Sequence, residues 1–464
     1  VLVDFGTNWI KMKALPEPVN LGQSYDSTGI DFKNSDLENG TSSQWIQTNL
    51  WTDNTNLGIN SPYNYRIRVR NGDGIEGAGG WQPVGWRTLA TAMQSPTSVN
   101  ILSISSYSTT ARVNPDSGYS NINSGASGLV IECHLSADYT SFISSTGWSK
   151  TENLTGNFSG LNANTTYYFR AKSRNRLGYE SAWSGFGSTV TLCATPTSNT
   201  PLNIASGSFT ARWGDGGNPG GTRYELWWST SANYSNYLSS ITTQNELDLT
   251  SLIANSTYYS QVRALNRAGT PTQWVSLPNV LTKIEEAQGI DFVDVSTGSI
   301  RVKVSGTFTA INEGSSGWLI DNITAGTSSQ WQSGTPYYWN SNSDPASGSD
   351  FSLKASKSYL FRARTRDRMG NITPYIEIST WTKAREPGYD NLSQISTYTI
   401  RANWTANENV SAQYYVECSS VSNFSIIYTT RDWTSSTSHL FNTLNPNTRY
   451  YFRVKTRNTN IAGT

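Results

Sequence analysis

The chain has few charged residues and no long apolar run. Charged residues make up 14% of its 464 residues, and the formal net charge is +1. Because proteins that bind nucleic acid usually carry a clear basic excess, the sequence predicts no nucleic-acid partner. No stretch approaches the roughly 18 consecutive apolar residues that cross a bilayer, so we also predict no membrane span within this sequence.

Residues that carry chemistry are scarce as well. The three cysteines, Cys133, Cys193 and Cys418, are too few for a disulfide framework, and the sequence leaves their redox state open. Cys133 and His134 are neighbours on an expected strand, so their side chains point to opposite faces and cannot share a metal ion. The sequence contains no phosphate-binding loop, zinc-ligand spacing or nucleophile elbow. It therefore predicts no catalytic residue, no metal site and no cofactor.

Aromatic and small polar residues are abundant instead. The chain has 17 Trp and 25 Tyr, which is too aromatic a composition for a disordered protein. Segments in which apolar and polar residues alternate, such as "SIRVKV" and "TIRANW", are separated by clusters of Gly, Asn, Ser and Asp. This is the pattern of short β-strands joined by turns. No amphipathic helical segment stands out, so we predict an all-β protein.

A repeated element divides the chain into small domains. In five near-copies a Leu precedes a Tyr by six positions, and successive tyrosines are between 91 and 104 residues apart. A period near 100 is a small domain rather than a solenoid unit. About seven short strands in each period imply a two-sheet sandwich. The five pairs are Leu57 and Tyr63, Leu161 and Tyr167, Leu252 and Tyr258, Leu353 and Tyr359, and Leu444 and Tyr450.

Each repeat resembles a fibronectin type III domain. The Leu-x5-Tyr element resembles that family's tyrosine corner, in which the hydroxyl of the Tyr binds an upstream backbone group. Trp213 and Trp404 stand where the family usually has its core tryptophan on strand B, and "SAWS" at Ser181–Ser184 resembles the entry to strand G. The resemblance implies a tandem array of five fibronectin type III-like β-sandwiches. The implied boundaries are 1–93, 94–194, 195–285, 286–385 and 386–464.

The two end repeats are expected to be incomplete. "VDFGTNWIKMK" from Val3 aligns with "VDVSTGSIRVK" from Val293, so the first sandwich should lack part of strand A. Thr464 follows the expected strand F of the fifth sandwich, which should therefore lack strand G. The chain is then either a part of a longer array or a sandwich completed by a neighbouring molecule's strand. The array is favoured because too few residues precede the first strand B to donate a whole strand, and because "GTSSQW" recurs at Gly40 and Gly326.

The expected strands F carry an outward row of Arg and Lys. Alternation along the strand turns the repeated Tyr inward and this row outward, and one carboxylate of each strand C should face it. We predict ion pairs covered by aromatic rings; the alternative is a basic groove for an anionic glycan or a nucleic acid. The carboxylates are Asp31, Glu132, Glu225, Asp321 and Glu417, and the expected aromatic residues are Trp183, Trp274 and Tyr375.

The third repeat departs from this pattern. Its strand F has fewer basic residues at the outward positions, and "YELWWS" turns an aromatic residue outward on strand C. An exposed apolar patch usually marks a contact, so this one is a candidate stacking platform for sugars or a seam against another chain; the alternative is ordinary packing under loops. The candidate contact patch consists of Trp227, Tyr259, Leu265 and Trp274.

Candidate glycosylation sites are frequent. Asn-x-Ser/Thr sequences occur at Asn153, Asn164, Asn322 and Asn371. In a chain so rich in Asn, Ser and Thr, their frequency is close to chance. They indicate only that the sequence is compatible with glycosylation.

Together these features predict a rod that is not an enzyme. Short linkers that contain proline, such as "MQSPTS", "CATPTS" and "AREPG", should limit bending between repeats. We expect an extracellular or cell-surface structural or adhesive protein, as a segment of a long surface protein or a filament subunit. Its expected partners are other copies of itself, adjacent repeats of a longer chain, and glycans. The alternatives are a spacer region of a secreted polysaccharide-degrading enzyme and a glycan- or receptor-binding ectodomain that uses the third repeat, because fold alone does not give function.

Overall fold

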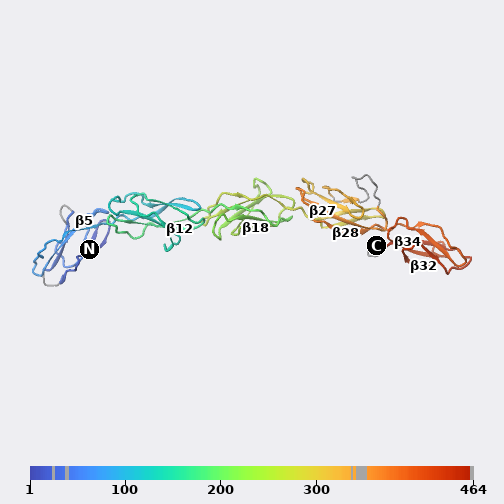
Figure 1. Ribbon diagram of the computed structural model, residues 1–464, viewed down its shortest axis with the longest axis horizontal. Helices are drawn as coiled ribbons and strands as arrows, with labels where there is room; N and C mark the ends of the chain where they lie inside the picture. The colour runs from blue at the N-terminus through green and yellow to red at the C-terminus, as the bar shows by residue number, and fades with distance from the viewer. Residues whose placement is uncertain (23–26, 37–40, 336–337, 341–352, 460–464) are drawn as a thin grey trace.

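The computed structural model shows an elongated, gently curved row of β-sandwiches (Figure 1). It describes residues 1–22, 27–36, 41–335, 338–340 and 353–459. Within these ranges the chain forms 34 strands and no helix, so the prediction of an all-β protein is confirmed. The labelled strands run roughly along the long axis of the row (Figure 1).

Five separate clusters of buried side chains are found among the described residues. Each contains the Tyr of one repeat, and the Leu of that repeat is in the cluster or, for Leu252, half-buried against it; we refer to the surrounding sandwiches as units one to five. Met93, Cys193 and Ile284 pack in the cores of units two, three and four. The boundaries predicted from the sequence assign these three to the preceding units. An apolar residue of each of these linkers is thus buried under the unit that follows.

The strands of each unit are short and follow one another along the chain. Those of unit one are β1 (Leu2–Phe5), β2 (Ile10–Met12), β3 (Gly29–Asn34), β4 (Trp51–Asp53), β5 (Pro62–Arg70) and β6 (Gln82–Ala90). Those of unit two are β7 (Ser98–Ile104), β8 (Ser108–Asn114), β9 (Gly128–His134), β10 (Phe142–Ser145), β11 (Thr155–Ser159), β12 (Thr166–Arg174) and β13 (Gly187–Val190). Those of unit three are β14 (Thr197–Ser198), β15 (Phe209–Gly214), β16 (Arg223–Ser229), β17 (Leu238–Thr242), β18 (Glu246–Leu249), β19 (Thr257–Leu265), β20 (Val275–Ser276) and β21 (Val280–Leu281).

Units four and five repeat the arrangement. Unit four has β22 (Gly289–Val295), β23 (Ile300–Ser305), β24 (Gly317–Asn322), β25 (Thr327–Ser328), β26 (Tyr338–Asn340), β27 (Ser358–Arg366) and β28 (Ile376–Trp381). Unit five has β29 (Gly388–Tyr389), β30 (Ile400–Thr405), β31 (Ala412–Ser419), β32 (Ile427–Thr434), β33 (Ser438–Phe441) and β34 (Tyr451–Asn458).

Each unit consists of two antiparallel sheets. In unit two the orders are β11-β8-β7 and β10-β9-β12-β13, and in unit four they are β22-β23-β26 and β25-β24-β27-β28. The long strands β12, β19 and β27 alternate strictly between buried and half-buried residues, as expected for strands with one face on the core and one face toward solvent. The buried faces of the two sheets form the core between them.

The repeated Tyr forms the same hydrogen bond in each sandwich. Its hydroxyl oxygen accepts a hydrogen bond from the backbone N–H of the residue that follows the repeated Leu, at 2.5–2.8 Å in all five units. The Leu and the Tyr are therefore held together by a backbone contact as well as by burial. Trp213 and Trp404 are buried in the cores of units three and five.

Candidate functional site

The first joint, between units one and two, is built around the side chain of Asn60. This residue lies three positions after the repeated Leu, is fully buried, and has a left-handed backbone with φ of 49°, a conformation that Asn adopts more readily than most residues. Its Nδ2 donates to the carbonyl oxygens of Ser120 and Asn121 and to Oγ of Ser127, at 2.9–3.1 Å. Its Oδ1 accepts from the backbone N–H of Arg176 at 2.8 Å. One amide thus binds two separate segments of the next unit.

The third joint, between units three and four, repeats this arrangement. Asn255 is fully buried with φ of 48°. Its Nδ2 donates to the carbonyl oxygens of Thr309 and Ala310 and to Oγ of Ser316, at 2.9–3.2 Å. Its Oδ1 accepts from the backbone N–H of Arg368 at 3.0 Å. The two joints therefore share the same donors and acceptors although their loops differ in sequence.

The second joint, between units two and three, uses Asn164 in the same way. Its Nδ2 donates to Oγ1 of Thr222 at 2.9 Å, and its Oδ1 accepts from the backbone N–H of Arg267 at 2.7 Å. We call Asn60, Asn164 and Asn255 the joint asparagines. Each fixes the following unit at two points, one between its strands B and C and one after its strand F.

A second set of hydrogen bonds runs in the opposite direction, from side chains of the following unit to backbone carbonyl oxygens of the preceding unit. Asn175 Nδ2 donates to the carbonyl oxygen of Thr91 at 3.0 Å, and Asn266 Nδ2 donates to that of Thr191 at 3.3 Å. At the third joint Asp367 stands at the matching position, and its carboxylate has no N–H to donate. There Oγ1 of Thr365 donates to the carbonyl oxygen of Glu285 at 2.7 Å instead.

The fourth joint, between units four and five, has a serine in place of the asparagine. Ser356 keeps the buried, left-handed backbone with φ of 52°. Its Oγ donates to the carbonyl oxygen of Ser411 at 2.7 Å, and its own carbonyl oxygen accepts from the N–H of Ser411 at 3.0 Å. The N–H of Thr459, which follows strand β34, donates to Ser411 rather than to residue 356. The serine thus holds one point of the next unit, whereas each joint asparagine holds two.

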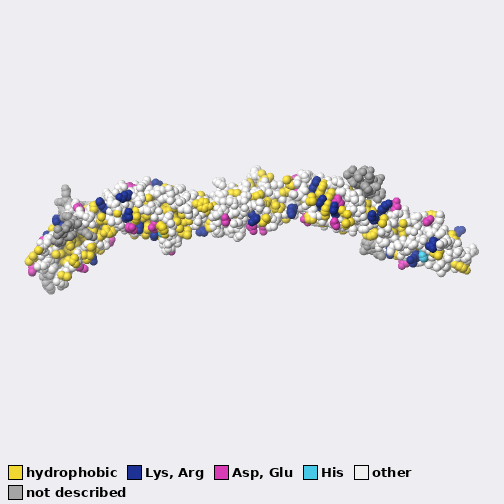
Figure 2. All heavy atoms as spheres, viewed as in Figure 1, with side chains coloured by type: hydrophobic (Ala, Val, Ile, Leu, Met, Phe, Trp, Pro, Cys, Tyr) yellow, Lys and Arg dark blue, Asp and Glu magenta, His cyan; other side chains and the backbone are white. Residues whose placement is uncertain are grey.

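The predicted ion pairs on the outer sheet are confirmed in all five units. The pairs are Arg68 with Asp31 at 3.0 Å, Arg170 with Glu132 at 2.8 Å, Arg263 with Glu225 at 2.7 Å, Arg362 with Asp321 at 2.9 Å, and Arg453 with Glu417. Over them lie the predicted aromatic rings: Trp183 at 4.0 Å from Arg170, Trp274 at 4.3 Å from Arg263, and Tyr375 at 4.0 Å from Arg362. Lys and Arg accordingly gather beside Asp and Glu in short rows, as Figure 2 shows for one face.

A second row of tryptophans was missed in the sequence. Their rings lie over the last arginine of strand F in four units, 4.1–4.7 Å from the guanidinium carbon. The signal was the equal spacing of Cys133 to Trp148 and of Cys418 to Trp433. These rings cover the guanidinium groups, which argues against a basic groove for an anionic ligand. The four pairs are Trp45 and Arg70, Trp148 and Arg174, Trp331 and Arg366, and Trp433 and Arg457.

The four residues of the candidate contact patch of unit three do not form one continuous surface. Trp227 packs between Tyr237, at 3.7 Å between ring centroids and nearly parallel, and Trp274, at 4.5 Å. Tyr259 and Leu265 are paired with residues at the two ends of β16, so they lie on either side of this cluster. The sequence did not identify Tyr237, which precedes the edge strand β17. One face of Trp227 is covered by Tyr237, so the ring is not a bare stacking platform.

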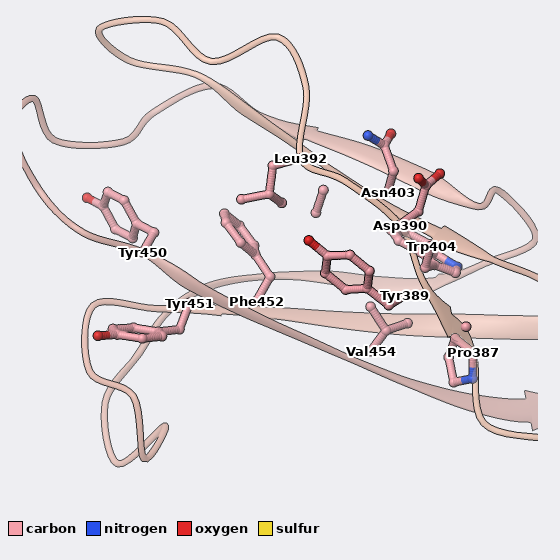
Figure 3. Close-up of a pocket in the computed structure, with 12 residues that line it drawn as sticks. Pro387, Tyr389, Asp390, Leu392, Asn403, Trp404, Tyr450, Tyr451, Phe452 and Val454 are labelled. Atoms are coloured by element: carbon pink, nitrogen blue, oxygen red, sulfur yellow. The ribbon is translucent and has the colours of Figure 1, made fainter.

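Unit five contains a groove of about 420 Å³ between its two sheets (Figure 3). Leu392 and Phe452 lie next to each other in this view, with the ring of Tyr389 beside them. Strand β34 pairs with β31 along one edge, and in the described part of the chain no strand pairs with its other edge. In units two and four the matching strands, β12 and β27, are paired along both edges.

Two of the four candidate glycosylation sites are corrected by the structure. Asn164 is a joint asparagine, and Asn322 is fully buried with its Oδ1 accepting from the N–H of Ala325 at 3.1 Å. A glycan on either nitrogen is incompatible with this packing. Asn153 and Asn371 are exposed and stay predictions.

The cysteines are buried and separate. Burial raises the pKa of the Cys133 thiol to about 12 and the pKa values of Cys193 and Cys418 to about 11, so all three stay protonated at neutral pH. All three are free thiols. In the described ranges, no group of three or more His, Cys, Asp or Glu side chains is placed to hold a metal ion. Nor does any helix there have the length and apolar character needed to cross a membrane.

Comparison with known proteins supports the resemblance stated above. Residues 386–464 match the fibronectin type III domain family. No curated protein matches the chain. Among solved structures, the chain is similar to a two-domain fibronectin type III segment of chicken tenascin, with 11% identity, coverage of 41% of this chain and 100% of that one, and a TM-score of 0.31. It is also similar to the FN1–FN3 domains of chicken CNTN1, with 16% identity, coverage of 62% and 99%, and a TM-score of 0.19.

Proposed function

We propose that this chain is a non-catalytic structural or adhesive rod, a segment of a long extracellular or cell-surface protein or a filament subunit. The observation that carries the proposal is the set of joint asparagines. Linked domains usually move relative to one another unless their interface is large or specific. Here one buried amide recurs at three joints with matching partners, as expected where the angle between units matters.

The energetics favour stiff joints. Opening a joint without admitting water would leave the asparagine and its partners unpaired, at a cost of about 1–3 kcal/mol for each buried polar group. The hydrogen bonds from Asn175 and Asn266 act on the same joints. The partners expected for such a rod are adjacent repeats of a longer chain or other copies of it.

The two alternative functions fit these observations less well. A spacer in a polysaccharide-degrading enzyme would need separation but not matching hydrogen bonds at three joints. A glycan-binding ectodomain would need an open aromatic face, whereas Tyr237 covers Trp227. Sequencing the natural protein would identify a catalytic domain, if the chain is an enzyme's spacer.

Small-angle X-ray scattering of the intact chain tests the proposal. A rod with fixed joints gives one scattering profile that a single elongated shape fits at all salt concentrations. If the profile instead requires an ensemble of strongly bent conformers, the joints do not set the angle and the structural proposal fails.

A further inference from the structure

Strand β17 forms the outer edge of the larger sheet of unit three. The sheet order is β17-β16-β19-β20. Strand β17 pairs with β16 at five successive positions without a register shift, and among the described residues no strand pairs with its other edge. Such an edge presents free backbone N–H and C=O groups that can pair with another chain.

The edge lacks the features that usually protect such strands. Natural edge strands avoid pairing by carrying charges, proline or bulges. The segment from Leu226 to Asn245 contains no charged residue and no proline, although 14% of the chain is charged. The matching edge strands differ from it: β10 has a register shift after Phe142, β25 has only two residues, and β32 has two shifts and contains Arg431 and Asp432.

Apolar side chains are exposed along this edge. Tyr237 is 43% exposed, Leu238 61% and Ile241 49%. Tyr237 is also held by its stacking on Trp227, so the edge is backed by a packed aromatic cluster. Exposed aliphatic groups beside an unpaired edge are disfavoured in water and gain from being covered by another chain.

We propose that β17 pairs with β17 of a second copy of this chain, antiparallel and centred on Ser240. In this register Leu238 lies opposite Thr242, and Ser239 opposite Ile241. A two-fold interface brings each side chain against its own sequence, so an edge without charges can meet itself without like-charge repulsion. The matching edges are less suited to such pairing, β10 and β32 because of their bulges and β25 because it is only two residues long.

A second copy fits this edge better than a glycan does. Sugars bind by stacking on open aromatic faces, but Trp227 is covered and the exposed groups of β17 itself are aliphatic and hydroxyl side chains. Pairing would join the two larger sheets of unit three into one continuous sheet. Because the strands run roughly along the row (Figure 1), the two rods would lie side by side in opposite directions. This lateral contact extends the proposed rod.

Sedimentation equilibrium of the intact chain tests the interface, with Leu238→Lys and Ile241→Lys combined as the test variant. The matched control is Phe142→Lys with Ile143→Lys, because these residues are similarly exposed, at 56% and 42%, on the bulged strand β10. Circular dichroism of both variants confirms that they fold. We expect a concentration-dependent dimer of the wild type and of the control. The dissociation constant of the test variant should rise by about tenfold or more, since charged side chains on an edge strand oppose its pairing with another chain.

Two results would overturn the interface: a wild type that stays monomeric at the highest concentration reached, or equal weakening by both variants. Hydrogen exchange gives an independent reading. Amides of residues 238–242 should exchange more slowly at concentrations where the dimer forms, while those of β10 should not change. Scattering tests the shape of the rod, and sedimentation tests the mass of the assembly. Either proposal can therefore fail while the other holds.

Discussion

The third and fourth joints differ at two matching positions: Ser356 replaces Asn255, and Asn458 replaces Asp367 and donates from its Nδ2 to the carbonyl oxygen of Thr382 at 3.0 Å. Asn255 reaches both the segment between strands B and C and the turn after strand F of the next unit, whereas Ser356 reaches only the first. The backbone is left-handed at both positions, so the local geometry is kept while the number of bonds changes. The comparison teaches that the two joints hold the end of strand F by different bonds: at the third joint the amide of Asn255 accepts from Arg368, and at the fourth joint Asn458 donates back to Thr382.

The largest expected effect comes from removing the amide. In Asn255→Ala, the N–H of Arg368 and the carbonyl oxygens of Thr309 and Ala310 lose their partner, and Ala is disfavoured at positive φ. The joint should lose about 1–3 kcal/mol of closed-state stability. Exchange of the Arg368 amide should therefore accelerate about tenfold to a hundredfold, as measured by hydrogen exchange. Asn153→Ala, on the surface of unit two, is the control; equal exchange rates in both variants would contradict the role of Asn255.

A smaller effect is expected from converting the fourth joint into the third type. Ser356→Asn provides an amide that can accept from the N–H of Thr459, which now donates to Ser411. We expect a gain of about 1 kcal/mol from one added hydrogen bond. Electron–electron resonance between spin labels at Ser379 and Asn423 should then show a narrower distance distribution. An unchanged or broader distribution would mean that the side chain at residue 356 does not control this joint.

A change inside a unit should affect the joints least. Glu225→Gln weakens the pair with Arg263 at 2.7 Å but leaves the joint asparagines intact. Since such half-exposed pairs contribute about 0.2–1 kcal/mol, the midpoint of thermal unfolding should fall only slightly, and less in high salt. The scattering profile should stay that of the wild type. A scattering profile that indicates a shorter or more strongly bent molecule would show that the ion pairs, rather than the joints, maintain the shape.

Unit five should also differ from the others in its response to pH. Burial, together with the nearby Arg431 and Arg401, lowers the pKa of His439. The folded state therefore prefers the neutral imidazole, and its contribution to stability is present above the unfolded pKa of about 6.5 and is lost as pH falls below it. Unfolding of the wild type at pH 5 should be slightly easier than at pH 7, and His439→Gln should reduce that difference. The same pH dependence in the variant would exclude His439 as its source.

The sandwiches could be predicted from the sequence, but the joints could not. Alternation along each strand and the spacing of Leu57 and Tyr63 depend on neighbours within one unit, and both are repeated five times. Asn60, by contrast, binds residues 60 to 116 positions later in the chain, where no local pattern records the contact. In Asn164 the sequon drew attention to glycosylation, although the residue is a buried contact.

A weak signal for the joints was present in the repeats themselves. The copies "LGIN", "LNAN" and "LIAN" each place an asparagine three positions after the Leu, and "LKAS" places a serine there. Asparagine at a left-handed position is common in turns, so the repetition alone does not separate a turn residue from a joint residue. For the contact patch, which stays a prediction, alternation gave the outward face, but it did not show that Tyr259 and Leu265 lie on either side of the Trp227 cluster.

The use of amides at the joints has a consequence for the conditions the rod can tolerate. Attraction between exposed charges is screened over about 8 Å at physiological ionic strength and over shorter distances in brine. Hydrogen bonds between a buried amide, backbone carbonyl oxygens and hydroxyl groups carry no net charge, and Asn60 and Asn164 do not titrate. The angle between units at the three joints with an asparagine should thus be the same in fresh water and in concentrated salt, and across a wide range of acidity.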